Sequence, residues 1–142
     1  MPSMKIIVAS DTKNNVTDAV IEHLKKRGHT LTLVGDLVSK NGKWAEIAKE
    51  AAKKVANDKM NQGIFFCWSG TGICMAANKI SGARAALCWD AETARLARKW
   101  NDANILCMSL RFVTEVLAQE ILDAWFSTEY DEENLDEVRK ID

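Results

Sequence analysis

The sequence has 142 residues, of which 47% are hydrophobic and 27% are charged. This composition is typical of a folded globular protein, and the length suffices for one domain but not for two ordinary ones. Nineteen basic residues face twenty acidic ones, for a net charge of -1. Because there is no basic surplus to neutralise a phosphate backbone, we expect no nucleic-acid partner. Residues 1–142 are therefore expected to form a single domain.

The amino-terminal residues contain no apolar run of signal-peptide length. No stretch approaches the roughly 20 apolar residues of a membrane helix. We therefore expect a cytoplasmic protein without a membrane partner, a compartment in which thiols stay reduced. The cysteine spacings match no common zinc pattern, so we expect no metal site and four free, mostly buried thiols. The cysteines are Cys67, Cys74, Cys88 and Cys107.

Short apolar runs alternate with helical patterns along the chain. Such runs suit strands covered on both faces, and apolar residues repeating every three to four positions indicate helices. In chain order, the first predicted elements are a strand over 4–10, a helix over 16–27, a strand over 31–35, a loop over 36–43, a helix over 44–57 and a strand over 62–67. The remainder are a glycine turn with a helix over 70–80, a strand over 84–88, a helix over 91–100, a strand over 104–108, a helix over 114–126 and a charged tail with a short helix over 127–142.

Five strands, each followed by a helix, predict an α/β fold. The expected architecture is a doubly wound, Rossmann-like, five-stranded parallel sheet with helices on both faces. The length suits a flavodoxin-like strand order. Ligands of such sheets bind outside the carboxyl ends of the strands. That rule selects residues 10–12, 67–72, 88–90 and 108–111 as candidate site segments.

The strongest local signal is residues 67–72, Cys-Trp-Ser-Gly-Thr-Gly. Gly70 and Gly72 allow a tight turn and a close approach to a ligand. Backbone N–H groups at the start of the following helix favour negative charge, so Cys67 can act there as a thiolate base or nucleophile. The segment lacks the lysine of a Walker loop and the G-x-G-x-x-G of a dinucleotide site. A buried structural thiol is the alternative interpretation of Cys67.

Several motifs in order resemble the ribose-5-phosphate isomerase B family, which includes the galactose-6-phosphate isomerase subunits. They are Ser10-Asp11, residues 67–72, 76–79, 82–88, 94–98, 101–106 and 121–125. The resemblance covers nearly the whole chain. It implies metal-free, cofactor-independent aldose–ketose isomerisation of a small sugar or sugar phosphate. It also implies a homodimer with active sites shared between subunits, with tetramers as the alternative assembly.

The resemblance also implies roles for individual residues. Cys67 stands where the family has the base that removes a proton next to the carbonyl. Ser69 stands where the family handles the hydroxyl proton, and the glycine turn after it stabilises the enediolate oxygen. The implied substrate-binding residues are Asp11, Thr12, Gly70, Thr71, Gly72, Trp100, Asn101 and Arg111.

The sequence departs from the family's usual pattern at three places. Thr12 and Trp100 stand where the family usually has histidines, and neither side chain can shuttle a proton as imidazole does. Residues 131–137 carry carboxylates where the family has phosphate-binding arginines, and carboxylates repel a phosphate. Arg111 is retained, and Arg139 can assist it. We therefore expect a substrate other than ribose 5-phosphate: a free sugar, a sugar acid or a differently phosphorylated sugar.

Several residues have two interpretations at this stage. Trp68, Trp89 and Trp100 are expected around the cleft, where aromatic rings stack on sugars, or at a dimer interface. His23 and His29 are expected to be structural or exposed. Two other functions stay open. The first is a non-catalytic sugar- or phosphate-binding module, and the second is a flavin-binding protein.

Overall fold

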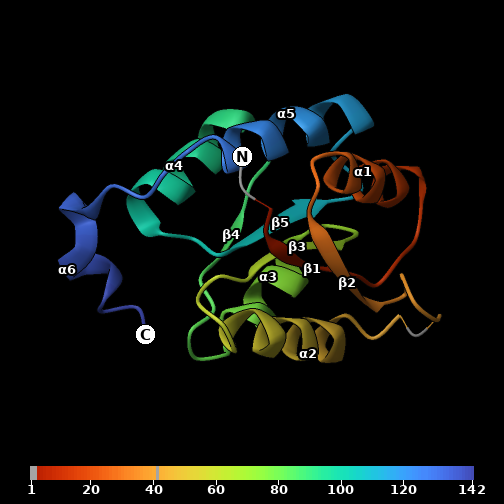
Figure 1. The fold of residues 1–142 in the computed structure, drawn as a ribbon. Coiled ribbons are helices and arrows are strands. Elements are labelled where there is room, and N and C mark those ends of the chain that lie inside the picture. Colours follow the sequence, from red (N-terminus) through yellow and green to blue (C-terminus); the bar gives the residue numbers. More distant parts are fainter. Residues whose placement is uncertain (1–2, 41) are drawn as a thin grey trace.

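A computed structural model describes residues 3–40 and 42–142 and contains a parallel five-stranded sheet between two layers of helices (Figure 1). The strands are β1 (Lys5–Ser10), β2 (Thr30–Gly35), β3 (Gln62–Cys67), β4 (Ala85–Leu87) and β5 (Ile105–Ser109). The helices are α1 (Asn15–Lys26), α2 (Trp44–Ala56), α3 (Thr71–Ala77), α4 (Ala91–Asn101), α5 (Glu115–Phe126), the 3-10 helix η1 (Glu132–Asn134) and α6 (Leu135–Val138). The predicted α/β class with helices on both faces is confirmed.

The strand order is β2-β1-β3-β5-β4. It differs from the flavodoxin-like order β2-β1-β3-β4-β5 in that the last two strands exchange places. The burial of the two strands explains the difference. All five residues of β5 are buried, whereas β4 has three half-buried residues. The continuously apolar strand takes the interior position, and the short strand takes the edge.

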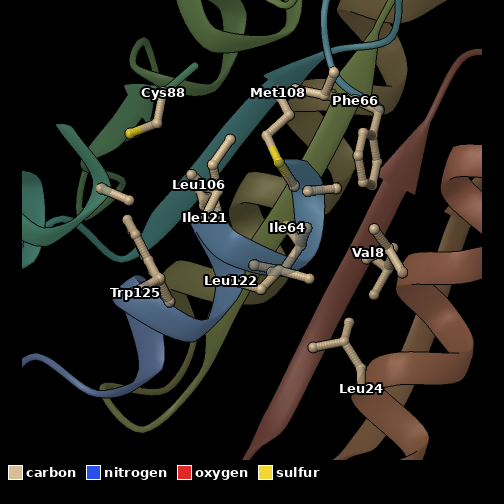
Figure 2. Packing of buried hydrophobic residues seen from close by; sticks show 14 of the residues in the cluster. Val8, Leu24, Ile64, Phe66, Cys88, Leu106, Met108, Ile121, Leu122 and Trp125 are labelled. Carbon is tan, nitrogen blue, oxygen red and sulfur yellow. The ribbon is translucent and has the colours of Figure 1, made fainter. Parts of the chain in front are cut away.

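Successive side chains of each strand point to opposite faces of the sheet, which divides the core in two. Figure 2 shows the first cluster, where Val8, Ile64, Phe66, Leu106 and Met108 meet residues of α1 and α5. The second cluster joins the other strand residues, including Phe65 and Cys67, to α2 and α3. The alanine-rich face of α2 lets that helix lie close to the sheet. Cys67 therefore belongs to the α2–α3 side of the molecule.

Side-chain caps fix where several helices begin. Asn14 accepts hydrogen bonds from the backbone N–H groups of Val16 and Thr17 at the start of α1, and Asp90 caps α4 in the same way through Thr93. Such caps satisfy N–H groups that have no partner within the helix. Among the helices of the described residues, none combines the length and apolar character needed to cross a membrane.

The tail forms the short helical turns expected from its sequence, η1 and α6. It packs beside the end of α4, where the backbone N–H of Asp131 donates to the carbonyl of Lys99 at 2.8 Å. Val138 is buried, and Asp142 pairs with Arg84 just before β4 at 3.4 Å. Figure 1 shows α6 beside this end of α4. Within one chain, the acidic segment 131–137 therefore lies toward the amino-terminal edge of the sheet.

Candidate functional site

A cavity of about 230 Å³ lies at the carboxyl ends of β1 and β3. These strands are neighbours, with Ser10 opposite Phe66, so Asp11 and Cys67 emerge side by side. This is the point where the strand order reverses, because β1 leads to one edge of the sheet and β3 to the other. The lining residues are Asp11, Trp44, Cys67, Trp68, Ser69, Thr71 and Gly72. The structure thus brings five of the sequence-predicted site residues together, namely Asp11, Cys67, Ser69, Thr71 and Gly72.

The thiol of Cys67 is held by the turn that follows it. Cys67 is only 5% exposed, and the backbone N–H of Gly70 donates to its Sγ at 3.2 Å. Such a donor stabilises negative charge on sulfur. Gly70 has a φ of 78°, and a Cβ there would lie 2.6 Å from Cδ1 of Leu87. Only glycine fits, so the turn and its N–H donor are fixed in place.

Two hydroxyl groups stand beside the thiol. The Oγ of Ser69 and the Oγ1 of Thr71 are 2.7 Å apart, and both residues are exposed. A hydroxyl can donate and accept a hydrogen bond at the same time. The pair can therefore pass a proton between two oxygens of a ligand seated in the cavity.

Trp44 forms a wall of the cavity, a role that was not predicted from the sequence. It is the first residue of α2, and a Cβ on Gly72 would lie 3.0 Å from Cε3 and Cζ3 of its ring. The ring is thus packed on the backbone of the glycine turn while 45% of the residue stays exposed. The only hint in the sequence is a tryptophan that opens a helix after a polar loop. The contact itself depends on the packing of α2 against α3.

Asp11 lies between this cavity and a second one of about 540 Å³, which Thr12, Lys13 and Lys40 also line. Burial raises the pKa of the Asp11 carboxyl, and the charge of Asp36 raises it further. The hydroxyl of Thr12 opposes this by donating to Oδ1 of Asp11 at 3.3 Å. Thr12 therefore lies beside the 230 Å³ cavity without lining it, and its hydroxyl contacts the Asp11 carboxyl.

The loop after β5 lies at the carboxyl ends of the strands, next to Cys67 and Trp68. The backbone N–H of Leu110 donates to the carbonyl of Cys67, and that of Arg111 donates to the carbonyl of Trp68, each at 3.0 Å. The Ser109 hydroxyl also donates to the Trp68 carbonyl, at 2.9 Å. These bonds tie the segment of Arg111 to the turn that follows β3. The Arg111 side chain is exposed and lies outside the described residues that line the 230 Å³ cavity.

Trp100 and Asn101 lie near the amino ends of the strands, at the opposite end of the sheet from Cys67. Both end α4, which starts after β4 and runs back to the beginning of β5. Eleven helical residues span about 16 Å, so the helix carries them away from Cys67. Within one chain, the structure therefore does not bring Trp100 together with Cys67. Asp102 follows them with a φ of 48° and pairs with Arg84 at 3.3 Å.

The remaining cysteines lie in the core or pack against it, with Cys88 in the first cluster and Cys107 and Cys74 in the second. Burial raises the pKa of Cys88 to about 12 and raises that of Cys107 well above its usual value. A hydrogen bond with Cys107 lowers the pKa of Cys74, which is half-buried rather than fully buried. All four cysteines are free, as expected.

Both histidines are structural, which confirms the expectation for them. The Nε2 of His23 lies 3.1 Å from Oδ1 of Asp123. It also accepts a hydrogen bond from Nε of Arg27 at 3.2 Å. His29 is buried and stacks on Phe126, with ring centroids 4.9 Å apart. Burial lowers the pKa of His29, and the nearby charge of Arg27 adds to the effect.

Comparisons with known proteins agree with this geometry. The Ribose/Galactose Isomerase family model matches residues 6–142. A D-erythrulose-4-phosphate isomerase of Pectobacterium atrosepticum is 36% identical over 124 residues, covering 87% of this chain and 79% of the relative. The ribose-5-phosphate isomerase B of Escherichia coli is 36% identical over 112 residues, covering 79% of this chain and 75% of the relative.

Solved structures give the same result. The ribose 5-phosphate isomerase B of Thermotoga maritima superposes with a TM-score of 0.90 at 33% identity, covering 98% of this chain and 97% of that one. The enzyme of Mycoplasma genitalium, solved with bound ribulose-5-phosphate, has a TM-score of 0.86 at 33% identity and covers 97% and 96%.

The parallel sheet and these matches define an isomerase of small sugars. The chain belongs to the Ribose/Galactose Isomerase family. It is an aldose–ketose isomerase of the ribose-5-phosphate isomerase B type, as the motifs in its sequence predicted.

Proposed function

We propose that the thiolate of Cys67 is the base of the isomerisation. In the aldose-to-ketose direction, Sγ takes the proton from carbon 2 and the released electron pair forms a double bond between carbons 1 and 2. The carbonyl electrons of carbon 1 then move to its oxygen, which gives an enediolate. Return of the proton to carbon 1 gives the ketose, after the hydroxyl proton of carbon 2 has moved to the oxygen of carbon 1. The observation that carries this proposal is the position of Sγ, in the cavity and bonded to the Gly70 N–H at 3.2 Å.

The groups around Cys67 can assist both halves of this reaction. Thr71 and Gly72 are the first residues of α3, so their N–H groups have no partner within the helix and can stabilise an enediolate oxygen. Ser69, paired with Thr71, can carry the hydroxyl proton between the two oxygens. With a base and charge stabilisation supplied by the chain, the proposed reaction needs neither a metal nor an organic cofactor.

We further propose that the working enzyme is a homodimer. Within one chain, Asn101 lies near the amino ends of the strands and Cys67 lies at their carboxyl ends. Asn101 of the partner subunit could therefore complete the site. Trp68, Trp89 and Phe112 are each more than half exposed at the carboxyl edge, which supports a protein partner there. Pairing of dimers into tetramers stays a prediction, and so does a cytoplasmic location.

The single domain over residues 1–142 also stays a prediction. The family match over residues 6–142 supports it.

The substrate we propose is a sugar phosphate. The similar proteins are named for D-erythrulose 4-phosphate, ribose 5-phosphate and galactose 6-phosphate, so their substrates span four to six carbons. Arg111 at the carboxyl edge and Lys40 at the neighbouring cavity offer positive charge for the phosphate. A non-phosphorylated sugar or a sugar acid is the competing substrate.

The test compares two cysteine variants in deuterated water. Cys67→Ala should lower both isomerisation and solvent exchange at carbon 2 by about 10²- to 10⁴-fold, the usual contribution of a general base. Cys74→Ala, which removes another thiol on the same side of the sheet, should keep most activity. Near-normal turnover by Cys67→Ala would contradict the assignment. Binding of sugar phosphates by the unmodified protein without any exchange would indicate a binding module instead.

A further inference from the structure

The corner between α4 and β5, residues 101–104, carries an exposed side chain on a tightly bonded backbone. The Asn101 side chain is exposed and makes no hydrogen bond with any other described residue. Asp102 follows it, and both oxygens of its carboxylate accept hydrogen bonds, Oδ1 from Arg98 at 3.4 Å and Oδ2 from Arg84 at 3.3 Å. The residue proposed to complete the partner's site is therefore exposed, while the residue next to it is held in place.

Asp102 has a backbone conformation that few residue types adopt. Its φ of 48° and ψ of 41° are left-handed, and it is the one residue other than glycine with a positive φ among those described. A Cβ makes this region unfavourable, and aspartate and asparagine tolerate it best. The Asp102 N–H donates to the carbonyl of Ala97, which closes the last turn of α4. Helix ends fray without such a cap, so the conformation of Asp102 determines where Asn101 lies.

Arg84, the residue before β4, binds both ends of this corner. Its Nε donates to the carbonyl of Asp102 at 2.7 Å, and its Nη2 donates to the carboxylate of the same residue. The planar guanidinium suits such a pair of acceptors, which an ammonium group cannot match. The backbone of Arg84 is paired with Asn104, whose Oδ1 accepts the Arg84 N–H at 2.7 Å and whose N–H donates to the Arg84 carbonyl at 3.0 Å. A single residue thus fixes the corner from Asp102 to the start of β5.

The two arginines contribute more to geometry than to stability. The side chains of Arg84 and Arg98 are 17% and 13% exposed, so their charges are partly removed from water. The cost of this desolvation offsets the attraction to Asp102, and such ion pairs add little net stability. Their hydrogen bonds do fix the chain, because Arg98 also donates to the carbonyl of Ala103. The carbonyls of two successive residues after Asn101 are therefore held by guanidinium groups.

Precise placement matters because Asn101 would work in another subunit. In the proposed dimer, the Cys67 and the Asn101 of one site belong to different chains. The fold around Cys67 therefore does not set the direction of the Asn101 amide. A misplacement of about 1 Å can cost on the order of 10²-fold in rate. The amide must thus be aligned by its own chain.

We propose, on the basis of the shared isomerase site above, that Arg84 and Asp102 are positioning residues that align the Asn101 amide for the active site of the partner subunit. Neither residue contacts the sugar. Their effect falls on the site whose thiol belongs to the other chain, and Arg98 supports them by holding the second carboxylate oxygen of Asp102.

The first test measures kcat/KM of single variants on ribose 5-phosphate or D-erythrulose 4-phosphate, whichever the unmodified protein isomerises faster. Asp102→Gly keeps the left-handed conformation but removes the carboxylate. Arg84→Lys keeps the charge but loses the forked contact. We expect each change to lower kcat/KM about tenfold while the protein stays folded and dimeric. The control is Arg95→Lys, the same exchange in a 2.6 Å ion pair with Glu92 on α4, which should leave kcat/KM unchanged.

Mixing Asp102→Gly with Cys67→Ala then locates the defect. When the two variants are refolded together, a mixed dimer joins the intact Cys67 of one chain to the intact corner of the other. If Asp102 acts across the interface, activity should rise from about 5% of the unmodified value, the mean of the two variants, to roughly one quarter. If Asp102 acts on its own chain, or only supports its fold, activity should stay at about 5%.

Each other outcome has a definite meaning. Full activity of Asp102→Gly would overturn the positioning role, and so would an equal loss in Arg95→Lys. The role would also be overturned if this mixture gains nothing while Cys67→Ala and Asn101→Ala restore one another, and the isomerase function would stand in all three cases. No isomerisation and no exchange at carbon 2 by the unmodified protein with either sugar phosphate would overturn the proposed function, and the positioning role with it.

Discussion

The ring of Trp44 rests on the backbone of Gly72, so closely that a Cβ on this glycine would lie 3.0 Å from two ring atoms. This contact joins the start of α2 to the start of α3 beside Cys67. It means that the shape of the cavity depends on a residue far from the glycine turn in the sequence. Trp44 is open to substitution because it is partly exposed, whereas a side chain on Gly72 would require the Trp44 ring to shift.

Replacing Trp44 should therefore affect substrate binding more than chemistry. Trp44→Ala removes the wall over Gly72, and we expect KM to rise roughly 5- to 20-fold, which corresponds to the 1–2 kcal/mol of a lost aromatic contact. The value of kcat should change less, because Cys67 and its turn remain. Steady-state kinetics would check this, with Met60→Ala as a matched control on an exposed side chain outside the site. An unchanged KM in Trp44→Ala would rule out a role in binding.

Gly70→Ala should damage both stability and activity. The new Cβ would meet Leu87 and the backbone of Met108 and Ser109, in a left-handed conformation that disfavours a side chain. We expect a loss of about 2–4 kcal/mol in the free energy of unfolding, together with most of the activity, since the N–H donor to Cys67 moves. Gly28→Ala is the control, because its φ of 85° is similar but nothing lies within 4 Å. It should cost only about 1 kcal/mol and leave kcat intact. Urea unfolding and initial rates measure the two effects, and equal stability losses in both variants would contradict the steric argument.

The raised pKa of Asp11 has a consequence for stability against pH. The folded state holds this proton more tightly than the unfolded chain does, because burial, followed by the charge of Asp36, disfavours the carboxylate. The stabilisation is present below the unfolded value of 3.8 and is lost as pH rises through the folded pKa. Asp11→Asn should therefore unfold at higher urea concentration than the unmodified protein at pH 7, and the difference should shrink toward pH 3. A constant difference across this range would show that Asp11 titrates normally.

Subunit sharing can be tested by mixing two inactive variants. Cys67→Ala and Asn101→Ala should each be inactive alone. If every site combines Cys67 of one chain with Asn101 of the partner subunit, a mixed dimer has one doubly defective site and one intact site. Unfolding and refolding the two together should then restore about one quarter of normal activity, because about half of the dimers are mixed. No recovery, with dimers confirmed by light scattering, would mean that Asn101 does not act across the subunits.

The parts of this protein that were predictable from sequence are those set by local rules. Apolar runs located the strands, and the glycines after Cys67 located the turn, because each depends on neighbouring residues. The interior position of β5 was not predictable from the apolar runs taken one at a time. It reflects competition between β4 and β5 for the position beside β3. The contact of Trp44 with Gly72 depends on tertiary packing. The placement of Asn101 near the amino ends of the strands follows from topology, because a helix after a parallel strand returns to the opposite end of the sheet.

The position of β4 also bears on how the chain folds during synthesis. β1, β2 and β3 can pair with one another as they emerge from the ribosome, but β4 pairs only with β5, which is made later. Until then the edge of β3 that will pair with β5 is unprotected, and such edges invite association with other chains. The backbone bonds to the turn after β3 come from Leu110 and Arg111, just after β5. The nascent protein therefore gains a competent active centre only with the last strand, so that premature termination before β5 yields an inactive, aggregation-prone fragment.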